Sequence, residues 1–322
     1  MRKQFLSPKL HLSSLPTPLE ALKNLQAELG LELYIKRDDL TSVGGGGNKV
    51  RKLEFLLADA LACGARTLLT IGALQSNHCR QTALLGAKLN LEVHLVLMGE
   101  MPDSRQGNLF LDHLAGARIH FTGRERGEGQ AYLERLFEES KQKGLEPYVI
   151  PYGGSNELGV QGYIAAWLEL EEQAKEKGLE FDFVVLPASS GGTIAGILIG
   201  QALTGSHTTS IGISVGPSKG ELEREIIELA QRTIKKLNIQ VPIPDFWLLD
   251  EFIGPGYGIL DQETQEAIKV MARKEGLLLD PVYTGKAFKG LLALAKRKEI
   301  KGRVLFWHTG GIPGLYAYAS IF

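Results

Sequence analysis

Apolar stretches of strand type alternate with helical patterns along almost the whole chain, and this alternation limits the fold more than any other feature. The strand-type stretches are Thr67–Gly72, Glu92–Gly99, Arg118–Thr122, Pro147–Tyr152, Phe181–Ala188, Thr209–Gly216, Phe246–Phe252 and Arg303–Thr309. The helical patterns lie near residues 76–90, 107–116, 129–143, 158–177, 192–204, 218–236, 261–274 and 286–298. Such alternation predicts an α/β fold of parallel sheets with helices on both faces.

The size, charge and cysteine content of the chain exclude several classes of protein. Its 322 residues can bury a large core and are enough for two domains. A net charge of −1 is not typical of proteins that bind nucleic acid or anionic membranes. No apolar run approaches the roughly 20 residues of a membrane helix, and the basic start lacks the apolar stretch of a secretory signal. Two cysteines, Cys63 and Cys79, are too few for a disulfide framework. We therefore expect a cytoplasmic, reduced protein.

The histidines lack metal-ligand spacing, so we predict no metal site. His78 and His308 stand at predicted helix and strand ends, but no partner marks either as a base. We therefore assign them no catalytic role.

A run of four glycines leads through Asn48 to Lys49, directly before an amphipathic helical pattern. Lys49 would be desolvated and close to Arg51 and Lys52, and both effects would disfavour its charged form and make its amine a better nucleophile. The N–H groups at the start of the helix suit an anion such as phosphate. A flexible loop with a solvated lysine is the competing interpretation of this segment.

Polar or glycine-rich loops follow three of the predicted strands. Ligands of open α/β sheets bind outside the carboxyl ends of the strands, so we expect these loops and the Lys49 segment to converge on one crevice. The loop from Ser189 to Thr193 would offer N–H and hydroxyl groups as a phosphate cradle, or would be a capped turn before a helix. Ser76 or Asn77 would cap the next helix if that segment stood alone.

Together these segments resemble the pyridoxal-phosphate enzymes of the tryptophan-synthase-β fold type, also called fold type II. The resemblance is closest to the branch that holds 1-aminocyclopropane-1-carboxylate deaminase and D-cysteine desulfhydrase. It runs from residue 36 to residue 311, and the segments 46–54 and 75–78 are specific to the branch.

The resemblance implies two open α/β/α domains with mainly parallel sheets. The small domain would hold residues 52–155, and the large domain would hold residues 1–51 and 156–322. A pyridoxal 5'-phosphate cofactor, a small amino-acid substrate and a homodimer are also implied.

Five residues near the cofactor ring receive roles from the resemblance. Lys49 would bind the cofactor covalently, and Asn77 would hydrogen-bond the ring hydroxyl. Ser76 would contact the substrate carboxylate or take part in proton transfer. Tyr257 and Tyr283 would face the substrate, although each stands in a turn-rich segment where a tyrosine can equally pack in a loop.

The resemblance also implies a phosphate site made by a lysine and a loop. The expected phosphate ligands are Lys52, Ser189, Ser190, Gly191, Gly192 and Thr193. Ser189 stands where the family loop usually begins with glycine, and this departure concerns the contact of that residue rather than the role of the loop.

Two positions distinguish members of the branch. The cyclopropane deaminases resemble each other in having glutamate and leucine where this chain has Thr284 and Thr309, as D-cysteine desulfhydrases do. A carboxylate near the ring nitrogen makes the cofactor a strong electron sink, whereas a threonine hydroxyl leaves it weaker. The implied function is a β-eliminating lyase that converts D-cysteine to pyruvate, sulfide and ammonia. The alternatives are a 1-aminocyclopropane-1-carboxylate deaminase or cysteate sulfo-lyase on the same scaffold, and a non-catalytic phosphometabolite-binding protein.

Overall fold

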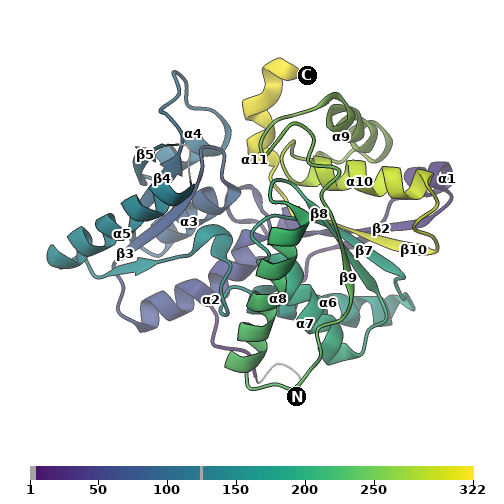
Figure 1. Ribbon diagram of the computed structural model, residues 1–322, viewed down its shortest axis with the longest axis horizontal. Helices are drawn as coiled ribbons and strands as arrows, with labels where there is room; N and C mark the ends of the chain where they lie inside the picture. The colour runs from purple at the N-terminus through teal and green to yellow at the C-terminus, as the bar shows by residue number, and fades with distance from the viewer. Residues whose placement is uncertain (1–4, 124–125) are drawn as a thin grey trace.

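The chain folds around two separate β-sheets in a computed structural model that describes residues 5–123 and 126–322 (Figure 1). The six-stranded sheet has the order β1 (Leu19–Ala21), β2 (Glu32–Arg37), β10 (Arg303–His308), β7 (Phe183–Ala188), β8 (Thr209–Ser214) and β9 (Phe246–Leu249). The four-stranded sheet has the order β5 (Arg118–Thr122), β4 (Glu92–Met98), β3 (Thr67–Ala73) and β6 (Pro147–Val149). All strand pairs are parallel except β1 with β2. The prediction of an α/β fold with mainly parallel sheets is confirmed.

Helices cover both faces of the six-stranded sheet. One face carries α6 (Gln161–Lys177), α7 (Gly192–Thr204) and α8 (Lys219–Lys236), and the other carries α1 (Lys23–Leu29), α9 (Gln262–Glu275) and α10 (Thr284–Lys296). Strand β7 shows the alternation of side chains: Val184 and Leu186 pack in the core with α6–α8, whereas Val185 packs with α9 and α10. This double burial explains why the strand is apolar at successive positions.

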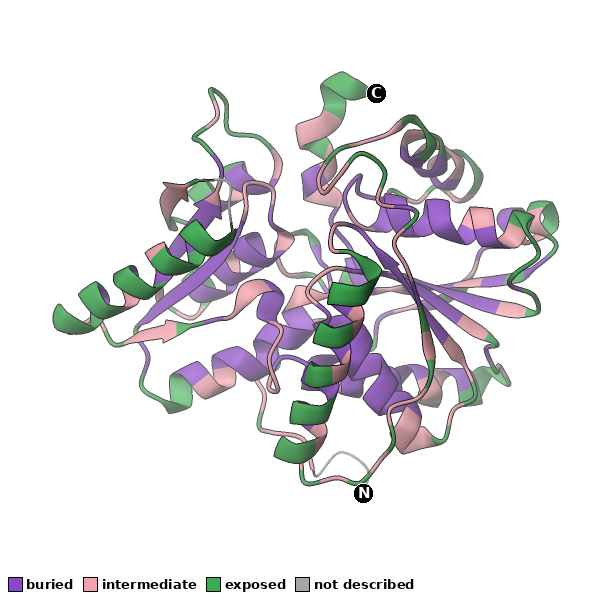
Figure 2. Ribbon diagram, viewed as in Figure 1, coloured by how far each residue is buried: buried purple, intermediate pink, exposed green. Residues whose placement is uncertain are grey.

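The four-stranded sheet is built in the same way. Helices α2 (Lys49–Ala62), α3 (Asn77–Lys88) and α4 (Gly107–Leu114) cover one face, and α5 (Arg126–Gln142) covers the other. Leu68 and its neighbour Leu69 in β3 point to these two cores respectively. Figure 2 shows the strands as mainly buried and the outer face of α8 as exposed. Helix α2 also packs on α6 and so links the two sheets. The domain boundaries at residues 52 and 155 stay predictions.

Two parts of the chain differ from the sequence patterns. β1, α1 and β2 were not predicted, because each is short and β2 mixes charged with apolar residues. The predicted strand 147–152 ends at Val149, and Tyr152–Gly154 forms the short helix η3, in which Gly153 and Gly154 have positive φ angles. Within the described residues, no helix is long and apolar enough to cross a membrane.

Candidate active site

The start of α2, the start of α3 and the loops after β7 and β10 enclose a cavity. Its lining consists of Asn48, Lys49, Asn77, Pro187, Ala188, Ser189, Ser190, Gly191, Thr193, Ile194, Tyr283 and Thr309. The loops that follow β7 and β10 leave the carboxyl ends of these strands, which is where open α/β sheets bind ligands. The structure therefore brings most of the expected site residues together. The expected residues outside this lining are Lys52, Ser76, Gly192, Tyr257 and Thr284.

Lys49 is the first residue of α2, and its side chain reaches the cavity from deep inside the protein. Its Nζ atom lies 3.4 Å from the carbonyl oxygen of Gly153. The accessible part of the side chain faces the cavity, yet burial in the protein lowers the pKa of Lys49 to about 8. A substantial fraction of this amine is neutral near that pH and available as a nucleophile.

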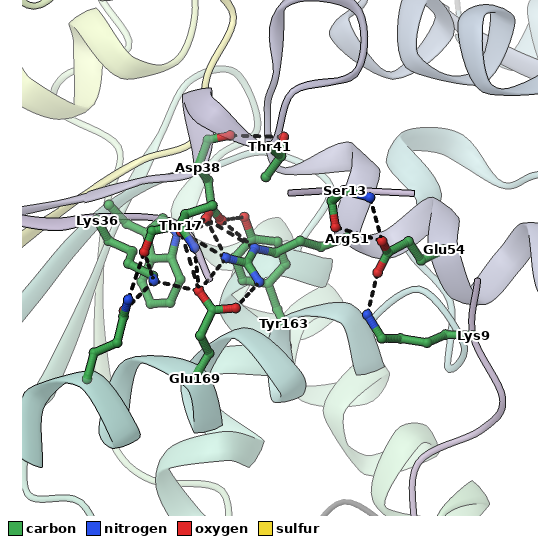
Figure 3. Close-up of polar contacts among 12 residues, drawn as sticks. Lys9, Ser13, Thr17, Lys36, Asp38, Thr41, Arg51, Glu54, Tyr163 and Glu169 are labelled. Carbon is green, nitrogen blue, oxygen red and sulfur yellow. Dashed lines mark hydrogen bonds and ion pairs between the residues drawn. The ribbon is translucent and has the colours of Figure 1, made fainter. Parts of the chain in front are cut away.

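Arg51 does not contribute to this shift, contrary to the expectation from its position in the sequence. Figure 3 shows its guanidinium between Asp38 and Glu169. Arg51 Nη2 donates to Asp38 Oδ1 at 2.8 Å, and Nη1 donates to Glu169 Oε2 at 2.9 Å. Lys36 Nζ also donates to Glu169, at 2.6 Å, so two cations balance two carboxylates. Burial alone would raise the pKa of Asp38, but the attraction of Arg51 outweighs it and lowers this pKa. The network anchors the first turn of α2.

Lys52 stands one turn after the start of α2 and faces the N-terminus of α7. Its Nζ atom lies 3.1 Å from Ser155 Oγ and 3.3 Å from the Gly153 carbonyl oxygen, which are neutral groups. A Cβ atom on Gly192 would come within 2.9 Å of the same Nζ, so only glycine leaves this approach open. Burial and the nearby charge of Lys49 hold the pKa of Lys52 well below its usual value. A buried amine beside free N–H groups at a helix start fits an anion such as phosphate.

Ser76 and Asn77 form the entry to α3. Ser76 Oγ accepts a hydrogen bond from the Cys79 N–H at 3.1 Å and so caps the helix. Asn77 lines the cavity, and its Oδ1 accepts a hydrogen bond from Asn108 Nδ2 at 2.8 Å. Ser76 therefore caps the helix, and its neighbour Asn77 lines the cavity.

Tyr283 lines the cavity, and two further tyrosines, of which the sequence pointed to one, gather beside it. The hydroxyls of Tyr257 and Tyr283 lie 2.5 Å apart, with one phenol donating to the other. Tyr152, at the start of η3, joins them, because the hydroxyls of Tyr257 and Ser189 face its phenol. Burial raises the pKa of all three phenols, so each stays neutral and keeps its proton for donation. Tyr152 could have been found from the sequence, because it stands directly before two glycines, and such glycines often mark the end of a strand in a parallel sheet.

Thr284 is buried at the start of α10, where its hydroxyl is already used. It donates to Asp280 Oδ1 at 2.7 Å and accepts from the Asp280 N–H at 2.8 Å. The Asp280 carboxylate in turn accepts from the N–H groups of Val282, Tyr283 and Thr284. Thr309 lines the cavity, and its carbonyl accepts from the Asn48 N–H at 2.9 Å. Asp280 is thus engaged in local turn bonds.

Comparisons with known proteins agree with this geometry. A family model described as "Pyridoxal-phosphate dependent enzyme" matches residues 11–310. The chain belongs to this family. Its cofactor is pyridoxal 5'-phosphate.

Relatives place this pyridoxal-phosphate enzyme near one branch. It is 43% identical over 314 residues to a Pyrococcus abyssi protein named "Putative 1-aminocyclopropane-1-carboxylate deaminase", covering 97% of this chain and 94% of that one. A crystal structure of an "ACC deaminase homologue" has a TM-score of 0.92 at 39% identity, covering 98% and 95% of the two chains. Threonine deaminase isoform 2 from Solanum lycopersicum, with a TM-score of 0.68 at 19% identity over 93% and 80%, shares the fold. Fold type II is confirmed.

The residues of this pyridoxal-phosphate enzyme fit the cofactor. Lys49 offers a reactive amine, and Lys52 with the start of α7 offers an anion site nearby. Lys49 and Lys52 both approach the Gly153 carbonyl, so a single phosphate-bearing ligand would engage both amines. Within residues 5–123 and 126–322, no cluster of three His, Cys, Asp or Glu side chains forms a metal site.

Proposed function

We propose that this enzyme is a β-eliminating lyase that acts on D-cysteine. The overall reaction consumes D-cysteine and water and yields pyruvate, sulfide and ammonia. One observation carries the proposal: no aspartate or glutamate is among the described residues that line the cavity. The positions at which cyclopropane deaminases have glutamate and leucine are Thr284 and Thr309 here.

The lack of a carboxylate in the wall favours a substrate with a good leaving group. When bound, pyridoxal phosphate supplies an electron sink that stabilises negative charge at the α-carbon. A carboxylate partner would strengthen this sink, and in this chain Asp280 is engaged with the backbone of α10 and the Thr284 hydroxyl. A thiolate that departs from the β-carbon takes the electron pair with it, so it requires less from the sink than the opening of a cyclopropane ring.

The side chains of the site supply the proton transfers. Lys49, with a pKa of about 8, accepts or releases a proton near neutral pH and is our candidate for removing the α-proton. Ser76 is the second candidate, because its hydroxyl stands beside Asn77 at the start of α3, where it bonds Cys79. The neutral phenols of Tyr257 and Tyr283 would donate to the departing sulfur.

Of the alternatives, the deaminase has support from the comparisons. The names of the relatives favour a 1-aminocyclopropane-1-carboxylate deaminase, and a cysteate sulfo-lyase would use the same scaffold with sulfite as the leaving group. A non-catalytic phosphometabolite-binding protein is less favoured, because Lys52 and the start of α7 already serve an anion and leave Lys49 without a binding task. The homodimeric state and cytoplasmic location stay predictions.

A substrate panel tests the proposal. The purified enzyme is given D-cysteine, L-cysteine, β-chloro-D-alanine, cysteate or aminocyclopropane carboxylate, and pyruvate, sulfide and ketobutyrate are measured. We expect pyruvate and sulfide from D-cysteine and pyruvate from chloroalanine. Ketobutyrate from the cyclopropane substrate, with little pyruvate from D-cysteine, would favour the deaminase instead. Lys49→Ala should abolish turnover, and Lys88→Ala on the exposed end of α3 is the matched control.

A further inference from the structure

We propose that Asn108, the second residue of α4, is a positioning residue that turns the Asn77 amide so that its Nδ2 donates into the cavity. The donation would reach the ring oxygen of pyridoxal phosphate, and in this respect the inference rests on the cofactor site described above. Asn108 is fully buried and does not line the cavity, so it would act only through Asn77.

A backbone carbonyl determines the orientation of the Asn108 amide. Asn108 Nδ2 lies 2.9 Å from the carbonyl oxygen of Gln75, which accepts hydrogen bonds and never donates them. The nitrogen, and not the oxygen, of the amide must therefore face this side. The second proton of the same nitrogen points to Asn77, at 2.8 Å.

The Asn108 amide in turn determines the orientation of the Asn77 amide. The atom of Asn77 that meets a donor must be its oxygen, so Oδ1 faces Asn108 and Nδ2 faces away. Because Asn77 lines the cavity, its amide presents two N–H donors there and no acceptor. N–H donors stabilise an anionic oxygen, whereas an amide oxygen in the same place would repel it.

The start of α4 is held against the entry to α3 by further bonds. Gln75 Oε1 accepts from the Asn108 N–H at 2.8 Å, and Gln75 Nε2 donates to the Gln106 carbonyl oxygen at 3.0 Å. Gly107 lies between them, and a Cβ atom there would come within 2.5 Å of Gln75 Oε1. The two segments therefore approach closely and leave Asn108 little freedom to turn.

Asn108 carries a cost that its packing does not explain. Its Oδ1 is buried without a hydrogen-bond partner among the described residues, and an orphaned acceptor destabilises the fold. An apolar side chain would avoid this cost. The advantage of asparagine here lies in its two donors, of which one holds Gln75 and the other orients Asn77.

The isosteric change Asn108→Asp tests this inference by reversing the polarity. A buried, protonated aspartic acid can still donate to the Gln75 carbonyl through the oxygen that replaces Nδ2, but that oxygen has no second proton and must accept from Asn77. The Asn77 amide would then turn its oxygen toward the cavity. We expect the dissociation constant of pyridoxal phosphate, measured by absorbance titration of the cofactor-free protein, to rise by about 10- to 100-fold.

A double-mutant cycle separates positioning from a general structural effect. In an Asn77→Ala background, Asn108→Asp should change the cofactor dissociation constant less than twofold, because the amide it acts through is gone. Equal effects of Asn108→Asp in both backgrounds, or no effect in the wild type, would overturn the proposal. Asn90→Asp, in the exposed turn that follows α3, makes the same chemical change as a control. If Asn108→Asp does not fold, Asn108→Ser enters the same cycle with the same expectations. A failure of the D-cysteine assay leaves this result unaffected, since no turnover is measured.

Discussion

Replacing Arg51 by methionine is expected to destabilise the enzyme strongly and to reverse how its stability depends on pH. Arg51 is 2% exposed, and its guanidinium donates to Asp38, Glu169 and Thr17. Methionine would fill much of the volume without a charge. Lys36 would then be left to balance two buried carboxylates.

The magnitude follows from the burial of the pair. Breaking a buried ion pair by removing one partner typically costs about 3–5 kcal/mol of the free energy of unfolding, because the other charge stays buried and unpaired. Asp38 keeps hydrogen bonds from Tyr163 and Trp307, which places the expected loss toward about 3 kcal/mol. An exposed pair offers a control: Arg297→Met, which breaks a pair with Glu251, should lower the free energy of unfolding far less, because both side chains stay in water.

The sign of the pH dependence distinguishes this mechanism from a packing defect. In the wild type the pKa values of Asp38 and Glu169 are lowered, so their contribution is complete above the unfolded pKa near 4 and is lost only in more acidic solution. In Arg51→Met burial raises the pKa of Asp38, so the penalty is full at high pH and fades as the pH falls through the raised value. Between that value and the unfolded pKa near 4, the variant should recover roughly 1.4 kcal/mol for each unit by which the pH falls.

Urea unfolding at pH 8 and pH 5, followed by the fluorescence of the buried tryptophans, measures both quantities. The double variant Arg51→Met/Asp38→Asn should be more stable than Arg51→Met at pH 8, because it removes the unpaired charge. A loss below about 1 kcal/mol, or a loss equal at both pH values, would refute the electrostatic argument.

Further predictions concern the cofactor. Borohydride reduction should place the cofactor label on Lys49, and a label on Lys52 or Lys286 would contradict the assignment. The rate of covalent attachment to the cofactor-free protein should rise with pH and level off above about 8, because only the neutral Lys49 amine reacts. Thr193→Val should weaken cofactor binding by about 10- to 150-fold, the equivalent of about 1.5–3 kcal/mol in a titration. Thr284→Glu should lower D-cysteine elimination, and an unchanged pyruvate assay would count against our interpretation of this position.

Most of the sheets and helices could be predicted because their signals are local. The strand Arg118–Thr122 and the helix from 192 to 204 have the predicted bounds, since hydrophobic periodicity and terminal glycines act among near neighbours. β2 could not be predicted in this way. Its Lys36 looks like a surface residue, and it is buried only because Glu169 of α6 lies beside it.

The sequence by itself determined the α/β layering and the position of Lys49 at the start of a helix, because strand and helix periodicity and a glycine run before a helix are local signals. Tertiary structure alone decided that Arg51 turns away from Lys49 toward Asp38 and that Tyr152 joins the site. It also decided the orientation of Asn77, whose partner Asn108 is 31 residues away in the chain. The desolvation of an amine and the direction of an amide depend on which groups the packing of the two sheets brings within hydrogen-bond distance. These groups are distant in the sequence, so the residues next to the amine or the amide do not predict them.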